Sequence, residues 1–235
     1  MPPFQSDDMP TVASKPHRSL WAAALIGHGE ALALLAARTA PTVYAWLRAS
    51  GSPPEEAQVR MEHFFARLLN AELPNPEEED VERMQDFLLR RLEAYGEAGL
   101  PDADASQLKS RIELNQPQAE RRYLREAKRG PEDVFTRRWA LGALELTIET
   151  VREEFNNDGK AALVPHLQQF LSFSGGEERY SDLAVQTGTS VSALHVAVYR
   201  YRQRYREILR QVVGDTVRNE EEVDSELTKL LVSAS

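Results

Sequence analysis

The sequence predicts an all-α protein made of two small helical domains joined by a flexible linker. Most segments repeat apolar residues at the three- and four-residue spacing of an amphipathic helix, and no segment alternates apolar and polar residues as a strand does. The helical pattern breaks between residues 97 and 130, where Gly, Pro, Asp and Ser gather. We therefore expect a first domain over residues 17–96, a linker over residues 97–130 and a second domain over residues 131–235. Residues 1–16 are expected to form a disordered arm.

The first domain is predicted to contain a series of amphipathic helices. Helical spacing begins at Leu20 and continues beyond Pro41 to Leu47. The next helix is expected to start at residues 52–56, Ser-Pro-Pro-Glu-Glu, where a hydroxyl cap, prolines and first-turn acids coincide. Acids at residues 77–80 precede another helix. The buried faces of these last two helices are predicted to be Ala57, Met61, Phe64, Phe65 and Leu68, and Val81, Met84, Leu88, Leu92 and Tyr95.

The second domain is predicted to begin with a long helix. Helical spacing runs from Glu132 to Val151 and is expected to stop at residues 156–159, Asn-Asn-Asp-Gly. Three shorter helical segments are expected over residues 119–127, within the linker, and over residues 160–170 and 223–231.

A helix-turn-helix is predicted over residues 180–210. Its first helix covers residues 180–187, Gly188 supplies the turn, and Thr189 and Ser190 offer a hydroxyl cap to a helix that starts near Val191. In a chain of net charge −9, the second helix carries five arginines against one glutamate: Arg200, Arg202, Arg204, Arg206 and Arg210 against Glu207. A basic face on an acidic chain is typical of contact with the phosphates of DNA.

The second helix of such a motif lies in the major groove of DNA, with its first residues facing base edges and later basic residues meeting phosphates. The candidate base or backbone contacts are Ser192, Ala193, His195, Val196 and Tyr199. The candidate phosphate contacts are Arg200, Arg202, Arg204 and Arg206. Arg200 and Arg204 share one helical face and Arg202 and Arg206 share another, so the four cannot all touch one groove. The alternative is a solvated helix whose arginines pair with Glu207 and with the acidic segment near the C-terminus.

The residues that carry most enzyme and metal chemistry are sparse. Without cysteine, the chain has no disulfide, no thiolate nucleophile and no cysteine-based zinc site. The five histidines lie in separate segments, and none forms an HExxH pattern. We therefore predict no active site, no metal, no cofactor and no enzyme activity. The apolar run from Trp21 to Leu35 is interrupted at residues 27–30, and no basic region followed by an apolar segment opens the chain, so we expect a cytoplasmic protein.

Several stretches of the chain resemble one bacterial family. In the second half these are residues 135–141 (FTRRWAL), 159–163 (GKAAL), 180–184 (YSDLA) and 193–206 (ALHVAVYRYRQRYR). In the first half they are residues 43–48 (VYAWLR), 52–57 (SPPEEA) and 64–69 (FFARLL). Through these stretches, most of residues 18–231 resembles the extracytoplasmic-function (ECF) sigma factors.

The resemblance implies a first domain that docks on the clamp of core RNA polymerase and melts the minus-ten promoter element. It implies a second domain that reads the minus-thirty-five element of double-stranded promoter DNA through its helix-turn-helix, with His195 where the family commonly has lysine. By the same resemblance, polymerase contacts fall on Arg60, Glu62, Phe64 and Phe65. Sigma factors of this kind direct polymerase to promoters, and an anti-sigma or other regulatory protein is a further expected partner.

Two departures from the family pattern keep other functions open. Residues 59–62, Val-Arg-Met-Glu, replace an Asp-Leu-x-Gln stretch, and residues 77–104 hold ten acids against three arginines where the promoter-melting helix is normally basic and aromatic. An acidic surface repels single-stranded DNA. One alternative is a degenerate sigma-like transcriptional regulator or adaptor that does not melt promoters and acts by protein-protein contacts. Another is an all-α adaptor whose arginines bind an acidic protein.

Overall fold

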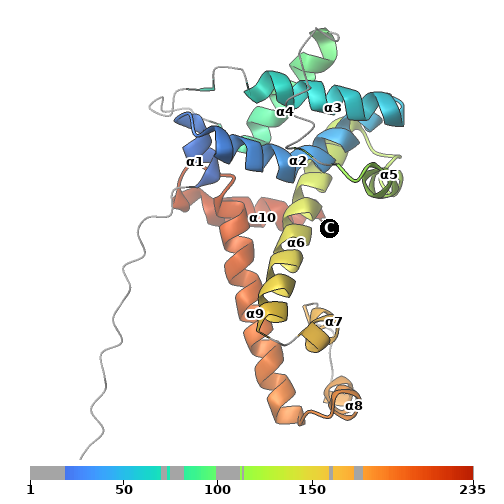
Figure 1. The fold of residues 1–235 in the computed structure, drawn as a ribbon, viewed down its shortest axis with the longest axis vertical. Helices are drawn as coiled ribbons and strands as arrows, with labels where there is room; N and C mark the ends of the chain where they lie inside the picture. The colour runs from blue at the N-terminus through green and yellow to red at the C-terminus, as the bar shows by residue number, and fades with distance from the viewer. Residues whose placement is uncertain are drawn as a thin grey trace, which may run out of the picture.

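The structure, a computed structural model, describes residues 19–69, 73–74, 82–98, 112, 114–158, 161–171 and 177–234. The regular elements within these ranges are all α-helices or short 3-10 helices, which confirms the all-α prediction (Figure 1). The predicted disordered arm over residues 1–16 and the acidic run over residues 77–80 lie outside the described residues.

Four helices of the first half form the broad upper part of the molecule in Figure 1: α1 (Leu20–Leu25), α2 (Gly29–Ala49), α3 (Pro54–Leu69) and α4 (Met84–Ala98). Ser19 caps α1 by accepting a 3.0 Å hydrogen bond from the backbone N–H of Ala22. α2 continues through Pro41. α3 begins at the predicted prolines, with Glu55 and Glu56 in its first turn. The capping and first-turn residues that predict where these helices begin therefore lie next to the helix starts in the sequence.

The segment between the two predicted domains contains a packed helix, α5 (Gln116–Leu124). Its residue Glu120 accepts hydrogen bonds from Arg48 Nε (2.9 Å), Arg48 Nη2 (2.8 Å) and Tyr44 Oη (2.7 Å) of α2. The hydrogen bonds from Arg48 hold the pKa of the Glu120 carboxyl below its ordinary value. This part of the predicted flexible linker is therefore docked on α2.

α6 (Pro131–Asn157) is the longest helix of the described chain, with 27 residues, and it begins and ends close to its predicted bounds. Its first turns pack on α2, and Phe135 and Trp139 belong to the same core as buried residues of α1 to α4. Its later turns pack beside α9 (Val191–Gly214), which runs in the opposite direction (Figure 1). α6 therefore contributes to the core of the first half and to that of the second.

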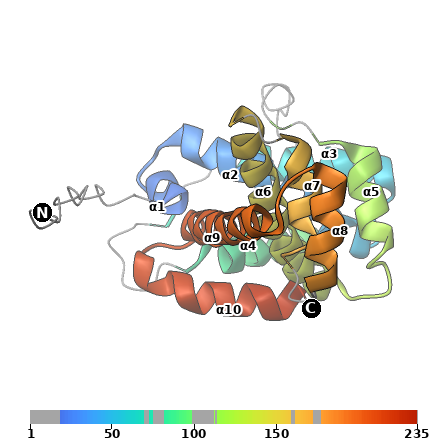
Figure 2. The same ribbon diagram turned by 90° about the horizontal axis from the view of Figure 1, so that it is seen from below.

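The remaining helices surround the α6–α9 pair. They are a 3-10 turn (Ala161–Leu163), α7 (Val164–Gln168), α8 (Glu177–Thr187), a second 3-10 turn (Glu220–Glu222) and α10 (Val223–Ala234). The helix expected over residues 160–170 is shorter than predicted, because the α-helix begins only at Val164 and carries Pro165, a residue suited to the first turn and not to the interior, in its first turn. In Figure 2, viewed from below, α8 lies beside α9. α10 lies on a different side of α9 from α8.

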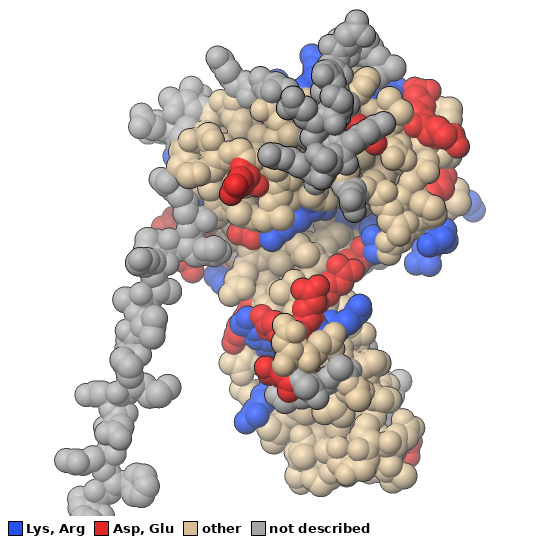
Figure 3. All heavy atoms as spheres, in the orientation of Figure 1, with Lys and Arg blue, Asp and Glu red and all other residues tan. Residues whose placement is uncertain are grey.

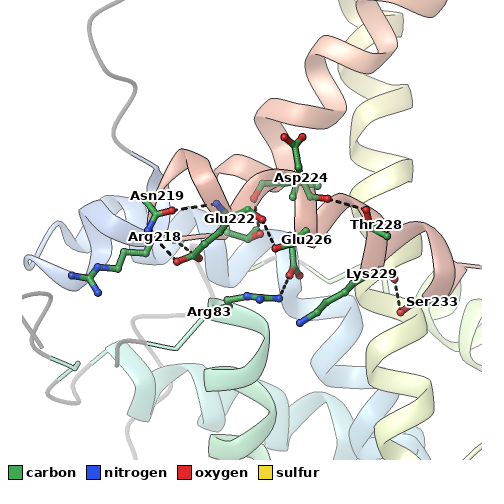
Figure 4. Close-up of polar contacts among 12 residues, drawn as sticks. Arg83, Arg218, Asn219, Glu222, Asp224, Glu226, Thr228, Lys229 and Ser233 are labelled. Atoms are coloured by element: carbon green, nitrogen blue, oxygen red, sulfur yellow. Dashed lines mark hydrogen bonds and ion pairs between the residues drawn. The ribbon is translucent and has the colours of Figure 1, made fainter. Parts of the chain in front are cut away.

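Residues 215–217, here called the α9–α10 joint, connect α9 to α10 and bind the first half. Their carbonyl oxygens accept hydrogen bonds from Trp21 N (2.9 Å), Met84 N (3.3 Å) and Ser19 Oγ (2.6 Å). Arg38 of α2 pairs with the Asp215 carboxylate at 2.8 Å, and Arg83 pairs with Glu226 of α10 at 2.6 Å (Figure 4). The described helices on the two sides of the predicted domain boundary therefore pack against each other.

Candidate nucleic-acid interface

The α8–α9 pair begins with a tight turn and a capped helix. Gly188 adopts a φ of 64°, in the left-handed region that side chains with a Cβ disfavour. Ser190 Oγ then accepts a 3.2 Å hydrogen bond from the N–H of Ala193, which satisfies a donor in the first turn of α9. Both features lie where the sequence predicts them.

Buried side chains hold α8 against α9. Leu183 of α8 and Leu194 and Val198 of α9 lie in one core cluster. The ring of His195 stacks on the ring of Tyr180, with centroids 3.9 Å apart and planes at 18°, and Tyr180 in turn contacts Phe170 at 4.6 Å. One face of the His195 imidazole is therefore covered by α8, and this histidine has a packing role besides any contact with DNA.

A continuous stripe of exposed residues follows α9, and we call it the α9 ridge: Ser192, Val196, Tyr199, Gln203 and Arg206. These residues are spaced by four, three, four and three, so they share one helical face. Arg200 is also exposed, one turn beyond Val196. Neither Arg200 nor Arg206 forms an ion pair or hydrogen bond with another described residue. The ridge and these two cations are available to a partner.

Arg202 and Arg204, the other two predicted phosphate contacts, form hydrogen bonds with other residues of the protein. Arg202 Nε donates a 2.7 Å hydrogen bond to the carbonyl of Phe170. Arg204 donates from Nε and Nη2 to Glu154 of α6, both at 2.7 Å, and from Nη1 to Glu207 at 2.9 Å. Hydrogen bonds to Glu154 and Glu207 raise the pKa of Arg204, and the same contact lowers the pKa of Glu154.

The alternative of an arginine helix paired with acids is partly present. Arg204 pairs with Glu207, and Arg210 pairs with Asp224 of α10. The helical faces expected from the sequence grouped Arg200 with Arg204 and Arg202 with Arg206. Of these four arginines in the structure, Arg200 and Arg206 are exposed, whereas Arg202 and Arg204 are less exposed and donate hydrogen bonds to other parts of the protein. The hydrogen bonds from Arg204 to Glu154 distinguish Arg204 from Arg200. No pattern in the sequence around Glu154 predicts this contact.

The surface around the start of α9 is weakly charged. On the face shown in Figure 3, the end of the molecule formed by α8 and the first turns of α9 is mostly uncharged. Val196 and Tyr199 are 49% and 67% exposed. The candidate interface therefore combines an apolar and aromatic ridge with the cationic side chains of Arg200 and Arg206.

The four predicted polymerase contacts face inward from α3. Phe64 and Phe65 are buried in the core of the first half, and Phe64 meets the ring of Tyr95 edge-on at 5.7 Å. Buried Glu62 accepts a 3.2 Å hydrogen bond from Gln58. Arg60 donates to Ser52 Oγ at 3.0 Å and lies over the Tyr95 ring. A partner that bound α3 in this conformation would therefore contact the exposed residues of the helix and not the buried side chains of Glu62, Phe64 and Phe65.

The described part of the predicted promoter-melting segment buries its aromatic residues. Phe87 and Tyr95 of α4 both lie in the core of the first half. Arg90 and Arg91 lie over the ring of Phe87, at 5.7 and 5.2 Å from its centroid. Residues 82–98 therefore present no exposed aromatic ring on which an unpaired base could stack.

Among the residues that the structure describes, no group of three or more His, Asp or Glu side chains is arranged to hold a metal ion. None of the helices in the described ranges has the length and apolar character needed to cross a bilayer.

Comparison with known proteins gives no relative on which to model this interface. The chain matches no protein-family model, no curated protein and no solved structure. A function for this surface therefore has to be inferred from the chain's own residues.

Proposed function

We propose that this protein is a divergent sigma factor of the ECF type, which binds core RNA polymerase in the cytoplasm and directs it to promoters. In this proposal, α8, the Gly188 turn and α9 act as a helix-turn-helix that reads the upstream promoter element in duplex DNA. The first four helices correspond to the domain that docks on polymerase. An anti-sigma or other regulatory protein is a further proposed partner.

The observation that carries the proposal is the exposed α9 ridge beside two cations. Ser190 caps α9 directly after the Gly188 turn, so the first turns of the helix project from the end of the molecule (Figure 1). In a groove-binding helix these turns face bases, and basic residues nearby meet phosphates. Arg200 and Arg206 have the exposure that such contacts require.

A second candidate keeps the DNA-binding helix but omits promoter melting. Burial of Phe87 and Tyr95 favours this candidate, because stacking on an unpaired strand needs exposed aromatic rings. The packing of the α9–α10 joint against α1, α2 and α4 also favours it, since a sigma factor places its two DNA-reading units on separate promoter elements. The protein would then be a sigma-like regulator or adaptor that acts by protein contacts.

Transcription in vitro separates the two candidates. The full chain is mixed with core RNA polymerase and fragmented genomic DNA of the same organism, and the 5′ ends of the transcripts are sequenced. A sigma factor produces discrete 5′ ends that core polymerase alone does not produce. Co-elution with core polymerase without such products would support the regulator. The absence of both co-elution and discrete 5′ ends would contradict both candidates.

Duplex binding tests the DNA contact itself. The logarithm of affinity is measured against the logarithm of salt concentration, and each phosphate contact contributes about −0.9 to the slope. Contacts by Arg200 and Arg206 predict a slope of about −2 or steeper. A slope near zero would point to an adaptor whose arginines do not meet phosphates.

A further inference from the structure

The exposed apolar side chains at the start of α9 require a partner surface that is itself partly apolar. Val191, Val196 and Tyr199 are 38%, 49% and 67% exposed, and Ala193 is exposed as well. These residues lie on the first turns of α9, in a chain in which 28% of residues are charged. An exposed apolar cluster of this kind marks a contact surface more often than an isolated apolar residue does.

The first nine residues of α9, Val191 to Tyr199, have few groups that could read bases by hydrogen bonds. Guanine is read by Arg or Lys and adenine by Asn or Gln through paired hydrogen bonds. Between Val191 and Tyr199 there is no Arg, Lys, Asn or Gln. The polar groups in this stretch are the hydroxyls of Ser192 and Tyr199, which can each form a single hydrogen bond with several bases, and His195, whose ring is stacked on Tyr180.

The geometry matches the floor of the major groove. The seven helical steps from Ser192 to Tyr199 rise about 10 Å along the helix, and the major groove is about 12 Å wide. Thymine displays a C5-methyl group there, the one apolar group that a base pair presents in that groove. Arg200 and Arg206 follow the apolar residues along α9, where the sugar-phosphate backbone borders the groove.

We propose that the α9 ridge recognises thymine methyl groups in duplex DNA through Val196 and Tyr199, while Arg200 and Arg206 contact the flanking phosphates. This inference rests on the proposed DNA contact of α9 and specifies the chemistry that it reads. Sequence preference then arises from apolar contact at thymines, with little contribution from paired hydrogen bonds to adenine or guanine.

The test compares duplexes that differ only in methyl groups. Binding of the full chain to an alternating dA–dT duplex is measured against the matching dA–dU duplex, at one fixed salt concentration. A second pair, alternating dG–dC with and without the C5-methyl on cytosine, presents the same difference on other base pairs. The methylated member of each pair is expected to bind about fourfold more tightly for each methyl group that α9 buries.

Variants assign the effect to the ridge. Val196→Ala and Tyr199→Ala each should reduce the ratio of affinities for the methylated and unmethylated duplexes toward one. Val232→Ala removes an equally apolar side chain that is 72% exposed on α10, and it should leave the ratio unchanged. All three positions are exposed, so the fold should tolerate the substitutions.

Two results would overturn the inference. Equal affinity of the unmodified chain for both members of each pair, with a salt slope that shows phosphate contact, would overturn methyl recognition and leave the proposed DNA contact intact. No measurable binding to any of the four duplexes would overturn the proposed DNA contact and the methyl recognition with it.

Discussion

Arg204 of α9 donates two hydrogen bonds to the carboxylate of Glu154 in α6, one from Nε and one from Nη2, both 2.7 Å long. Paired hydrogen bonds between a guanidinium and a carboxylate set the relative orientation of the two groups. The contact therefore fixes α9 beside α6 at the level of Arg204. An arginine that the sequence assigns to DNA thus stabilises the helix pair that presents the α9 ridge.

The Arg204–Glu154 pair is expected to make a small contribution to stability. Both side chains are more than a third exposed, so Arg204→Ala should lower the free energy of unfolding by no more than about 1 kcal/mol, measured by urea denaturation. Arg206→Ala is the matched control, since Arg206 has no ion pair with another described residue, and it should leave the free energy unchanged. A larger loss in Arg206→Ala than in Arg204→Ala would contradict this assignment.

The same pair predicts a pH dependence. Hydrogen bonds from Arg204 lower the pKa of Glu154 in the folded protein. A carboxyl with a lowered folded pKa adds stability above its unfolded pKa, about 4.3, and loses it as pH falls through the folded pKa. The difference in free energy of unfolding between the unmodified chain and Glu154→Gln should therefore be constant near neutral pH and shrink below about pH 4.3. An undiminished difference in acid would mean that the Glu154 charge is not responsible.

Exposed and packed arginines should differ in DNA binding. Arg200→Ala and Arg206→Ala should each weaken duplex binding and flatten the salt slope by about one unit, because each loses one phosphate contact. Arg121→Ala, which removes an exposed arginine from α5, is the control for net charge. If Arg121→Ala flattens the slope as much as the other two variants, the effect is one of overall charge and α9 is not the contact surface.

Gly188 is expected to be required for the conformation of the α8–α9 turn. Its φ of 64° makes an added Cβ unfavourable by about 1 to 2 kcal/mol, so Gly188→Ala should destabilise the protein by roughly that amount. Gly142→Ala is the matched control, because Gly142 lies within α6 and an added Cβ meets nothing within 4 Å. This control should raise the free energy of unfolding by about 0.5 to 1 kcal/mol. Equal effects at the two glycines would contradict the turn geometry.

The contact of α10 with the first half depends on Arg83 and Glu226. Glu226 is buried, so Arg83→Ala leaves a buried carboxylate without its ion pair and should cost about 3 kcal/mol of unfolding free energy (Figure 4). Replacement of both residues by apolar ones of similar volume, Arg83→Met with Glu226→Leu, should restore most of the stability. The measurement is urea denaturation of both variants. A double variant as unstable as Arg83→Ala would show that the charges themselves are needed.

Much of the secondary structure could be predicted because its signals are local. The bounds of α6, the serine cap at Ser190 and the turn at Gly188 follow from residues within a few positions of each. The short α7 shows the limit of periodicity, since Pro165 delays a helix that the apolar spacing alone would start earlier. The docking of α5 on α2 was not predicted, because the Arg48–Glu120 contact joins residues 72 positions apart.

The candidate site divides in the same way. Apolar spacing and capping residues were enough to place an arginine-rich helix after a glycine turn, and those properties belong to neighbouring residues. Which arginines face solvent was settled by packing: Arg204 meets Glu154, 50 residues away, and Arg202 meets the Phe170 carbonyl, 32 residues away. A long side chain takes whichever acceptor the folded chain brings near it, and that acceptor belongs to another element. For this reason the sequence alone predicts the arginine-rich helix. Which of its arginines are exposed is decided by the packing of α6, α7 and α9 in the tertiary structure.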